Sequence, residues 1–212
     1  MRFQHFVFNP FGVNCFALSN DAGETILIDP SVSNSREQEA LSQYIESNGL
    51  KIVRLLNTHL HLDHVLGNAF VESTYGIKAE AHQEDEFLLD LQEEQSSMYG
   101  LPFDEPAPAL GDYLAEGDTV EIPDIKLHVI HVAGHSPGGL AFYCEKQGDQ
   151  PPLLFSGDIL FAGSMGRSDL FGGDEHALVT GITQKLLTLP GETIVLPGHG
   201  PSTTIADERR NF

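Results

Sequence analysis

The feature that most constrains this chain is a short segment that holds four potential metal ligands. In the segment THLHLDH these ligands are His59, His61, Asp63 and His64. Along an extended stretch His59, His61 and Asp63 project to one side, whereas His64 points elsewhere. Neutral imidazole and carboxylate both suit zinc, iron and manganese. One loop can therefore supply two adjacent metal ions, and this density of ligands favours a metal site over a solvated, histidine-rich loop.

The ligand segment lies between an apolar run and a helical pattern. Residues 52–56, IVRLL, predict a buried strand, and residues 65–70, VLGNAF, predict the first turns of a helix. Open α/β sheets place their sites at loops of this kind, where a strand ends and a helix begins.

Three further potential ligands each follow a predicted strand and have glycine neighbours. They are His135 in AGHSPGG, Asp158 in SGDILF and His199 in PGHGP. Small neighbours let the backbone turn sharply and leave room for an ion. Taken singly, each is equally consistent with an ordinary turn residue. Together with the first segment they make five histidines and two aspartates, a set that suits two metal ions better than one.

The order of the predicted elements indicates the fold class. Strand pairs are followed by helix–strand alternation in each half of the chain, which predicts two packed sheets with helices outside, not one doubly wound sheet. At 212 residues we expect one domain, residues 1–212. Cys15 and Cys144 lie in apolar strand-like runs, so we expect buried, unpaired cysteines.

Charge and composition exclude several kinds of partner. The formal charge is −20, with only 11 Lys and Arg, so nucleic acid and acidic membrane surfaces are poor partners. No apolar run approaches the roughly 20 residues of a membrane helix, and the first residues lack a signal-peptide pattern. We therefore expect a cytoplasmic protein.

The ordered motifs resemble the metallo-β-lactamase superfamily. They run from Asp29 to Pro201 and comprise His-x-His-x-Asp-His, Gly-His, Gly-Asp and Pro-Gly-His-Gly. SGDILF followed by GRSD is similar to the glyoxalase II branch, the hydroxyacylglutathione hydrolases. EDEF at 84–87 and MYGL at 98–101 resemble its short, single-domain bacterial members. The resemblance implies an α/β fold of the four-layer αββα type.

The resemblance also implies a ligand set and a reaction. One metal would be held by His59, His61 and His135, the second by Asp63, His64 and His199, with Asp158 bridging. Zinc is the expected metal, with iron and manganese as alternatives. A hydroxide between the two ions would attack the carbonyl of S-lactoylglutathione or a related acyl thioester. Asp63 would orient the attacking group or accept its proton.

Several other residues carry two interpretations. Asp29 is either a solvated strand end or an acceptor behind a ligand histidine. Arg167 and Asp169 form either a surface ion pair or, as in the family, a pair that braces the loop after Asp158; the bracing role is favoured.

The substrate pocket is predicted from apolar side chains and one long loop. Tyr143, Phe161 and Met165 either line the pocket or belong to the core. Residues 92–110, with Pro102, Pro106 and Pro108, predict an irregular loop that forms one wall of the substrate site.

The motifs leave open the thiol of the substrate and two other functions. Glyoxalase II continues with a helical domain that contacts glutathione, whereas this chain ends at Phe212; a small-molecule thioester is therefore expected, but its thiol is not fixed. A persulfide dioxygenase-like oxidoreductase with one iron would share these motifs, and a metal-stabilised binding module would need no turnover. Asp158 argues against a β-lactamase, which usually lacks this aspartate. The sequence does not predict the oligomeric state.

Overall fold

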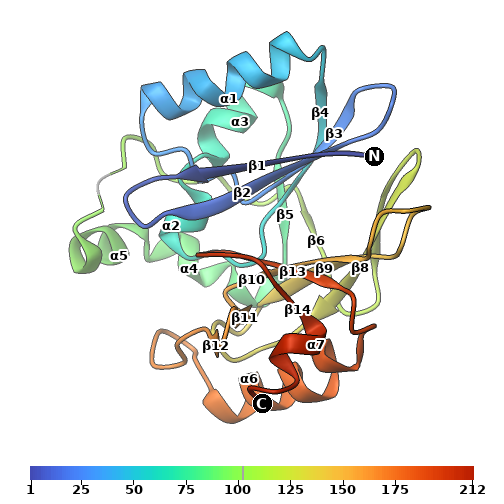
Figure 1. Ribbon diagram of the computed structural model, residues 1–212. Coiled ribbons are helices and arrows are strands. Elements are labelled where there is room, and N and C mark those ends of the chain that lie inside the picture. Colours follow the sequence, from blue (N-terminus) through green and yellow to red (C-terminus); the bar gives the residue numbers. More distant parts are fainter. Residues whose placement is uncertain (102) are drawn as a thin grey trace.

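The protein folds into four layers, with helices outside two six-stranded sheets (Figure 1). This computed structural model describes residues 1–101 and 103–212. The predicted αββα arrangement is confirmed. Within the described ranges, no helix is both long enough and apolar enough to cross a lipid bilayer.

The first sheet is built by the N-terminal half of the chain. Its three N-terminal strands are antiparallel, and the remaining strands continue in parallel. Helices α1 (Ser35–Ser47) and α3 (Asn68–Tyr75) cover its outer face (Figure 1). The strand order is β1 (Arg2–Phe8), β2 (Val13–Ser19), β3 (Glu24–Ile28), β4 (Lys51–Leu56), β5 (Ala79–Ala81) and β6 (Asp112–Tyr113).

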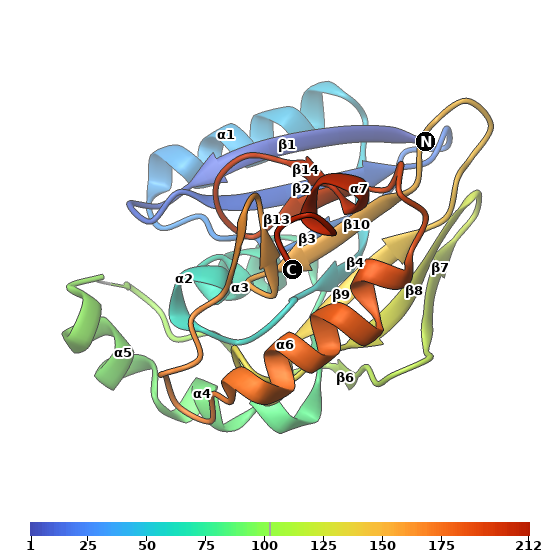
Figure 2. The same cartoon turned by 60° about the horizontal axis from the view of Figure 1, so that its bottom comes forward.

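The second sheet is built by the C-terminal half, and α6 (Glu175–Gln184) runs across its outer face (Figure 2). A short hairpin, β11 (Leu160–Phe161) and β12 (Ser164–Met165), follows β10. A short helix, α7 (Ile205–Glu208), follows the last strand. The strand order is β14 (Thr203–Thr204), β13 (Ile194–Pro197), β10 (Leu153–Gly157), β9 (Leu140–Cys144), β8 (Ile125–His131) and β7 (Thr119–Ile122).

Apolar side chains fill three layers, one between the sheets and one under each set of helices. Between the sheets Phe16 meets Phe155 with ring centroids 5.2 Å apart. Strand β2 is buried on both faces because Phe16 points to the other sheet while Cys15 points to α1. Both cysteines are buried and free, as predicted. The third layer packs Leu154 against α6.

The prediction of a long irregular loop at 92–110 is partly wrong, because Gln92–Tyr99 form helix α5. This helix has no apolar stripe that a sequence pattern could reveal. Its buried side chains are glutamines: Gln92 bonds the backbone of Ala107, and Gln95 accepts from the Leu62 backbone N–H at 2.9 Å. Hydrogen bonds of these side-chain amides attach α5 to the rest of the protein in place of an apolar stripe. Pro102 lies outside the described residues.

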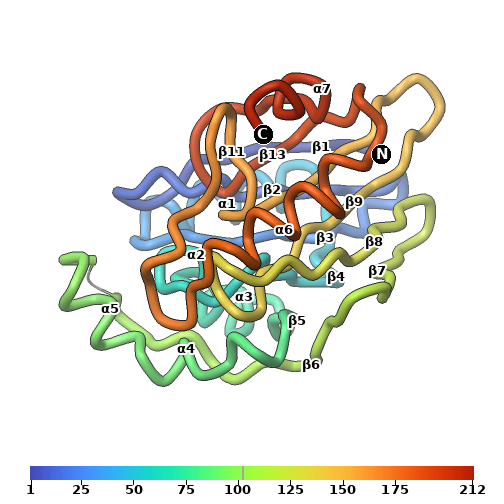
Figure 3. Tube along the Cα trace, turned by 90° about the horizontal axis from the view of Figure 1, so that it is seen from below, coloured from blue at the N-terminus to red at the C-terminus, as the bar shows by residue number. Residues whose placement is uncertain are grey.

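The turn between β1 and β2, helix α2 (Leu62–Val65) and α5 gather at one end of the molecule (Figures 1 and 3). Two short helical segments, η1 (Gln83–Asp85) and α4 (Phe87–Asp90), precede α5, and a 3₁₀ turn, η2 (Leu186–Thr188), follows α6. Strands β4, β10 and β13 lead into the loops that carry the predicted ligands.

Backbone hydrogen bonds join the two sheets at this end. The Leu140 N–H donates to the Thr58 carbonyl at 2.7 Å, and the Asn14 N–H donates to the Gly198 carbonyl at 2.7 Å. The Asn14 side chain also donates to the Pro197 carbonyl at 2.8 Å. These hydrogen bonds fix the ligand loops of the two halves next to each other.

Gly67 permits a close approach that positions the ligand segment. A Cβ at this position would lie 1.8 Å from the Pro30 carbonyl oxygen, so any side chain would push the start of α3 away from the loop after β3. We expect Gly67→Ala to lower the free energy of unfolding by about 2–3 kcal/mol, measured by urea denaturation. The matched control is Gly191→Ala, whose Cβ would meet Ala206 at 3.4 Å. Equal stability of the two variants would contradict this account.

Candidate metal centre

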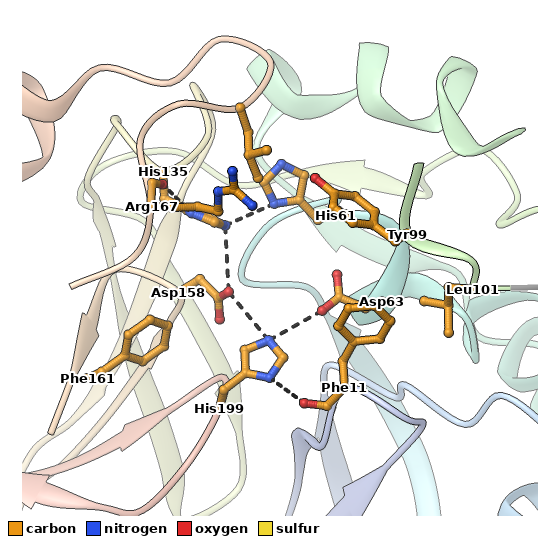
Figure 4. A pocket seen from close by; sticks show the side chains of 11 residues that line it. Phe11, His61, Asp63, Tyr99, Leu101, His135, Asp158, Phe161, Arg167 and His199 are labelled. Carbon is orange, nitrogen blue, oxygen red and sulfur yellow. Dashed lines mark hydrogen bonds and ion pairs between the residues drawn. The ribbon is translucent and has the colours of Figure 1, made fainter. Parts of the chain in front are cut away.

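All seven predicted ligands converge at the end of the molecule where the loops meet. Figure 4 shows five of them, His61, Asp63, His135, Asp158 and His199. Their potential ligand atoms form three overlapping groups, and within each group these atoms lie within 4.8 Å of one another. The groups are His59, His61 and His135; His59, His64 and Asp158; and Asp63, His64 and His199.

Asp158 lies between the two outer groups. Its Oδ1 is 3.4 Å from His64 Nε2, and its Oδ2 is 3.7 Å from His135 Nε2 and 3.5 Å from His199 Nε2. One carboxylate therefore faces both sets of histidines, which is the position that a bridging ligand would need.

The polar atoms of the cluster fit a pair of divalent cations. His135 Nε2 lies 2.9 Å from His61 Nδ1 and 3.3 Å from His59 Nε2, so ring nitrogens face one another. His61 Nε2 and Asp158 Oδ1 are buried and have no hydrogen-bond partner among the described residues. Buried polar atoms without partners are costly, and imidazole with carboxylate is a donor set that binds zinc, iron or manganese.

A glycine keeps this space open. A Cβ on Gly198 would lie 2.2 Å from Asp158 Oδ1. Any side chain at this position would displace the carboxylate from between the two groups of histidines.

Two rings of the first group, His59 and His61, are held in the neutral form that metal binding requires. Burial lowers the pKa of His59 well below its usual range, and the neighbouring histidines lower it further. Burial and the nearby His135 lower the pKa of His61 to about 3. A metal ligand must offer a free lone pair. At neutral pH these two rings are unprotonated, so they can bind a cation without first losing a proton.

The second group has a strongly negative environment. Burial lowers the pKa of His64, but Asp158, Asp63 and Asp29 outweigh that effect and hold it well above its usual value. Burial raises the pKa of Asp158, yet the interaction with His64 dominates and keeps the carboxyl ionised. The carboxylates therefore attract positive charge to this position, either a proton or a metal ion.

Asp29 lies behind His64, and its position supports the interpretation of an acceptor for a ligand histidine. The side chain is 1% exposed, and its Oδ2 accepts from His64 Nδ1 at 3.1 Å. The same carboxylate accepts from the Thr58 backbone N–H at 2.8 Å and from the Thr58 hydroxyl at 2.7 Å. It thus fixes both the orientation of the ring and the start of the ligand segment.

Backbone carbonyls orient two more ligands. His135 Nδ1 donates to the Arg167 carbonyl at 2.8 Å, and His199 Nδ1 donates to the Phe11 carbonyl at 3.1 Å. The Arg167 guanidinium pairs with both carboxylate oxygens of Asp169, at 2.6 and 2.8 Å. This exposed pair lies in the segment whose backbone holds His135, an arrangement consistent with a brace.

Asp85 is a residue that the sequence analysis missed. It is fully buried and accepts hydrogen bonds from the backbone N–H groups of Leu60 and Gly138 and, at 2.7 Å, from the Ser136 hydroxyl. Leu60 lies between two ligands, and Ser136 follows His135. One carboxylate therefore joins the two loops of the first group. Asp85 lies within the EDEF motif at 84–87, but nothing in that motif distinguishes its carboxylate from those of Glu84 and Glu86.

A pocket of about 290 Å³ opens directly onto the cluster (Figure 4). His61, Asp63, His135, Asp158 and His199 face it, and its apolar walls are Phe11, Tyr99, Leu101, Phe161 and Leu170. Tyr99 and Leu101 come from the stretch predicted to form a wall.

Two predicted pocket residues belong to the core instead. Tyr143 and Met165 pack in the apolar layer beneath α6, and the lining within the described residues does not include them. Tyr143 lies on β9, and Met165 pairs with Leu160 in the short hairpin; both pack against the same apolar cluster as Leu178 and Ile182 of α6. Phe161 does line the pocket.

Comparison with known proteins identifies the family. The family model described as the metallo-beta-lactamase superfamily matches residues 8–199. This chain belongs to the metallo-β-lactamase superfamily. A probable metallo-hydrolase, YqgX of Bacillus subtilis, is 36% identical over 99% of this chain and 95% of its own length. Hydroxyacylglutathione hydrolase GloC of Haemophilus influenzae is 33% identical over 95% of this chain and 92% of its own length.

Two solved structures share the fold closely. The B3 metallo-beta-lactamase BLEG-1 is 34% identical, with a TM-score of 0.87 over 99% of this chain and 97% of its own. TTHA1623, solved in a di-iron-bound form, is also 34% identical, with a TM-score of 0.82 over 98% of both chains. The superfamily and the His and Asp cluster together indicate divalent metal binding and a hydrolytic enzyme.

Replacing Asp29 by Asn tests its support of the second group. The amide keeps the size of the side chain, but its NH2 group would face either the Thr58 backbone N–H or His64 Nδ1, so one of these donors would lose its acceptor. We expect affinity for the second metal equivalent to fall about 10- to 100-fold, measured by competition with a chromogenic chelator. The control is Asp21→Asn, which is exposed in the turn before β3. Unchanged metal affinity in Asp29→Asn would exclude this role.

Replacing Asp85 by Asn tests the link between the loops of the first group. The amide would offer one acceptor oxygen where three donors now meet a charged carboxylate, so we expect a loss of about 2–3 kcal/mol in the free energy of unfolding. The first metal equivalent should weaken while the second is retained, the reverse of Asp29→Asn. Elemental analysis after dialysis counts the ions retained, and NMR of the histidine side chains shows which group holds them; loss of the ion from the same group in both variants would contradict the assignment.

Proposed function

We propose that this protein is a dinuclear metal-dependent hydrolase that cleaves a small acyl thioester. The observation that carries the proposal is Asp158, a single carboxylate that faces two sets of histidines at the floor of a pocket. In this proposal His59, His61 and His135 hold one ion, and Asp63, His64 and His199 hold the other, with Asp158 shared. The GloC relative supports the choice of a thioester.

The bound ions would lower the pKa of a shared water toward neutrality and polarise the substrate carbonyl. The chain's own contribution to proton transfer is Asp63. Its Oδ2 lies 3.3 Å from His199 Nε2, and its other oxygen points into the pocket (Figure 4). Burial raises the pKa of Asp63, but His64 and His199 reverse the effect, so this carboxylate is ionised at neutral pH.

Asp63 is therefore placed to accept the proton of the attacking water. Attack on the carbonyl carbon breaks the carbon–sulfur bond, and the electron pair leaves with sulfur. The proton held by Asp63 can then pass to the thiolate, so that one water converts the thioester into a carboxylic acid and a thiol.

The identity of the metal is a separate part of the proposal. Zinc is our first choice, because it serves as a hydrolytic metal without redox chemistry. Iron is the alternative that the di-iron form of TTHA1623 supports, and the ligand set accepts manganese as well.

A second candidate function is β-lactam hydrolysis. The likeness to BLEG-1, a B3 metallo-beta-lactamase at 34% identity, favours it, although Asp158 argued against it at the level of sequence motifs. A chromogenic cephalosporin assayed beside the thioester would separate the two.

Replacing Asp158 by Ala is the direct test of the proposed centre. We expect the protein to lose at least one metal equivalent and thioester hydrolysis to fall by about 10³-fold or more, because the two ligand sets lose their shared carboxylate. Metal content is measured by elemental analysis and activity by the loss of thioester absorbance. The control is Asp21→Asn.

Three results would contradict the proposal. Full turnover by protein that holds one metal or none would exclude the dinuclear scheme. Oxygen uptake with glutathione persulfide in place of thioester hydrolysis would support the mononuclear iron oxidoreductase. Metal retention with no turnover of thioester or β-lactam would support a non-catalytic binding module.

A further inference from the structure

The walls of the pocket above the candidate metal centre are mostly apolar, which does not suit the charged groups of a glutathione substrate. Five apolar or aromatic side chains surround the ligand floor, whereas Arg167 is the one lysine or arginine among the lining residues that the structure describes. The Arg167 guanidinium is already paired with both oxygens of Asp169. A glutathione thioester brings two carboxylates and one ammonium group, which need oppositely charged or hydrogen-bonding partners.

The entrance of the pocket is apolar as well. Phe11, in the turn between β1 and β2, contacts Tyr99 at the end of α5, with ring centroids 6.2 Å apart. Phe11 lines the pocket and is 43% exposed, whereas Tyr99 and Phe161 are partly buried. An exposed aromatic side chain at a pocket entrance is typical of a site that takes an apolar ligand.

The small volume of the pocket and the negative charge of the chain also favour a small, uncharged substrate. A volume of about 290 Å³ lies at the lower end of the roughly 300–1,000 Å³ of small-molecule sites. The chain has 31 acidic and 11 basic residues, so its field repels an anionic substrate.

We infer that the pocket selects small thioesters with an apolar acyl chain on an uncharged thiol, in preference to glutathione thioesters. This inference rests on the proposed thioesterase function. The apolar acyl chain would lie against Phe161, Leu101 and Leu170, with the carbonyl at the ligand floor. The thiol portion would leave between Phe11 and Tyr99.

A matched substrate series tests the inference with the metal-loaded, full-length protein. Acetyl, butanoyl and hexanoyl thioesters of N-acetylcysteamine vary only the acyl chain, and hexanoyl-glutathione varies only the thiol. We expect kcat/KM to rise about fourfold for each added methylene until the pocket is filled. Hexanoyl-N-acetylcysteamine should exceed hexanoyl-glutathione by about tenfold in kcat/KM, because the carboxylates of glutathione meet no unpaired cation within the described part of the lining.

A charge variant tests the same inference from the protein side. Leu170→Lys adds a cation to the wall, and Leu170→Met is the matched control without charge. We expect Lys to shift the ratio of kcat/KM toward the glutathione thioester by about three- to fivefold relative to Met, and 0.5 M salt to remove most of the shift. Thermal unfolding of both variants establishes that they fold.

The outcomes separate the inference from the function on which it rests. A higher kcat/KM for lactoyl-glutathione than for hexanoyl-N-acetylcysteamine, or no dependence on acyl length, would overturn the inference and leave the thioesterase function standing. No hydrolysis of any thioester above that of metal-free protein would overturn the proposed function itself.

Discussion

The hydrogen bonds that join the two sheets at one end are the interaction on which the rest of the site depends. The Thr58 carbonyl accepts from Leu140, and the Gly198 carbonyl accepts from Asn14, so the ligand loops of both halves are fixed side by side. Neither half carries a complete ligand set. His59, His61, Asp63 and His64 come from the first half, and His135, Asp158 and His199 come from the second. The candidate centre exists only because the sheets meet at this edge.

Two buried carboxylates make that edge rigid. Asp29 holds the first residue of the ligand segment and the ring of His64, while Asp85 ties the same segment to the loop of His135. Each carboxylate is satisfied by several donors, which offsets the cost of burying its charge. Because both act on backbone N–H groups as well as on side chains, they set the shape of the loops before any ion binds.

The sequence predicted the fold class and the residues that converge at the candidate metal centre, because both leave strong local patterns. The alternation of strands and helices is regular, and the seven ligands stand in short motifs, three of them with glycine neighbours. What it did not predict depends on long-range contacts. Helix α5 is stabilised by buried glutamines instead of an apolar stripe, and Asp85 reaches its partners across 25 to 53 residues of sequence. Tyr143 and Phe161 are both aromatic residues that follow apolar runs, and only the packing of α6 places one in the core and the other at the pocket.

Phe11 contributes to two parts of the site at once. Its ring forms part of the pocket entrance, and its carbonyl accepts the hydrogen bond that orients His199. A molecule that wedges the entrance open moves the same backbone that holds a ligand imidazole. If that backbone moved, occupancy of the pocket and occupancy of the ion position would be coupled, and such a coupling is reciprocal. Through the turn between β1 and β2, a molecule bound in the pocket would change the affinity of His199 for a metal ion.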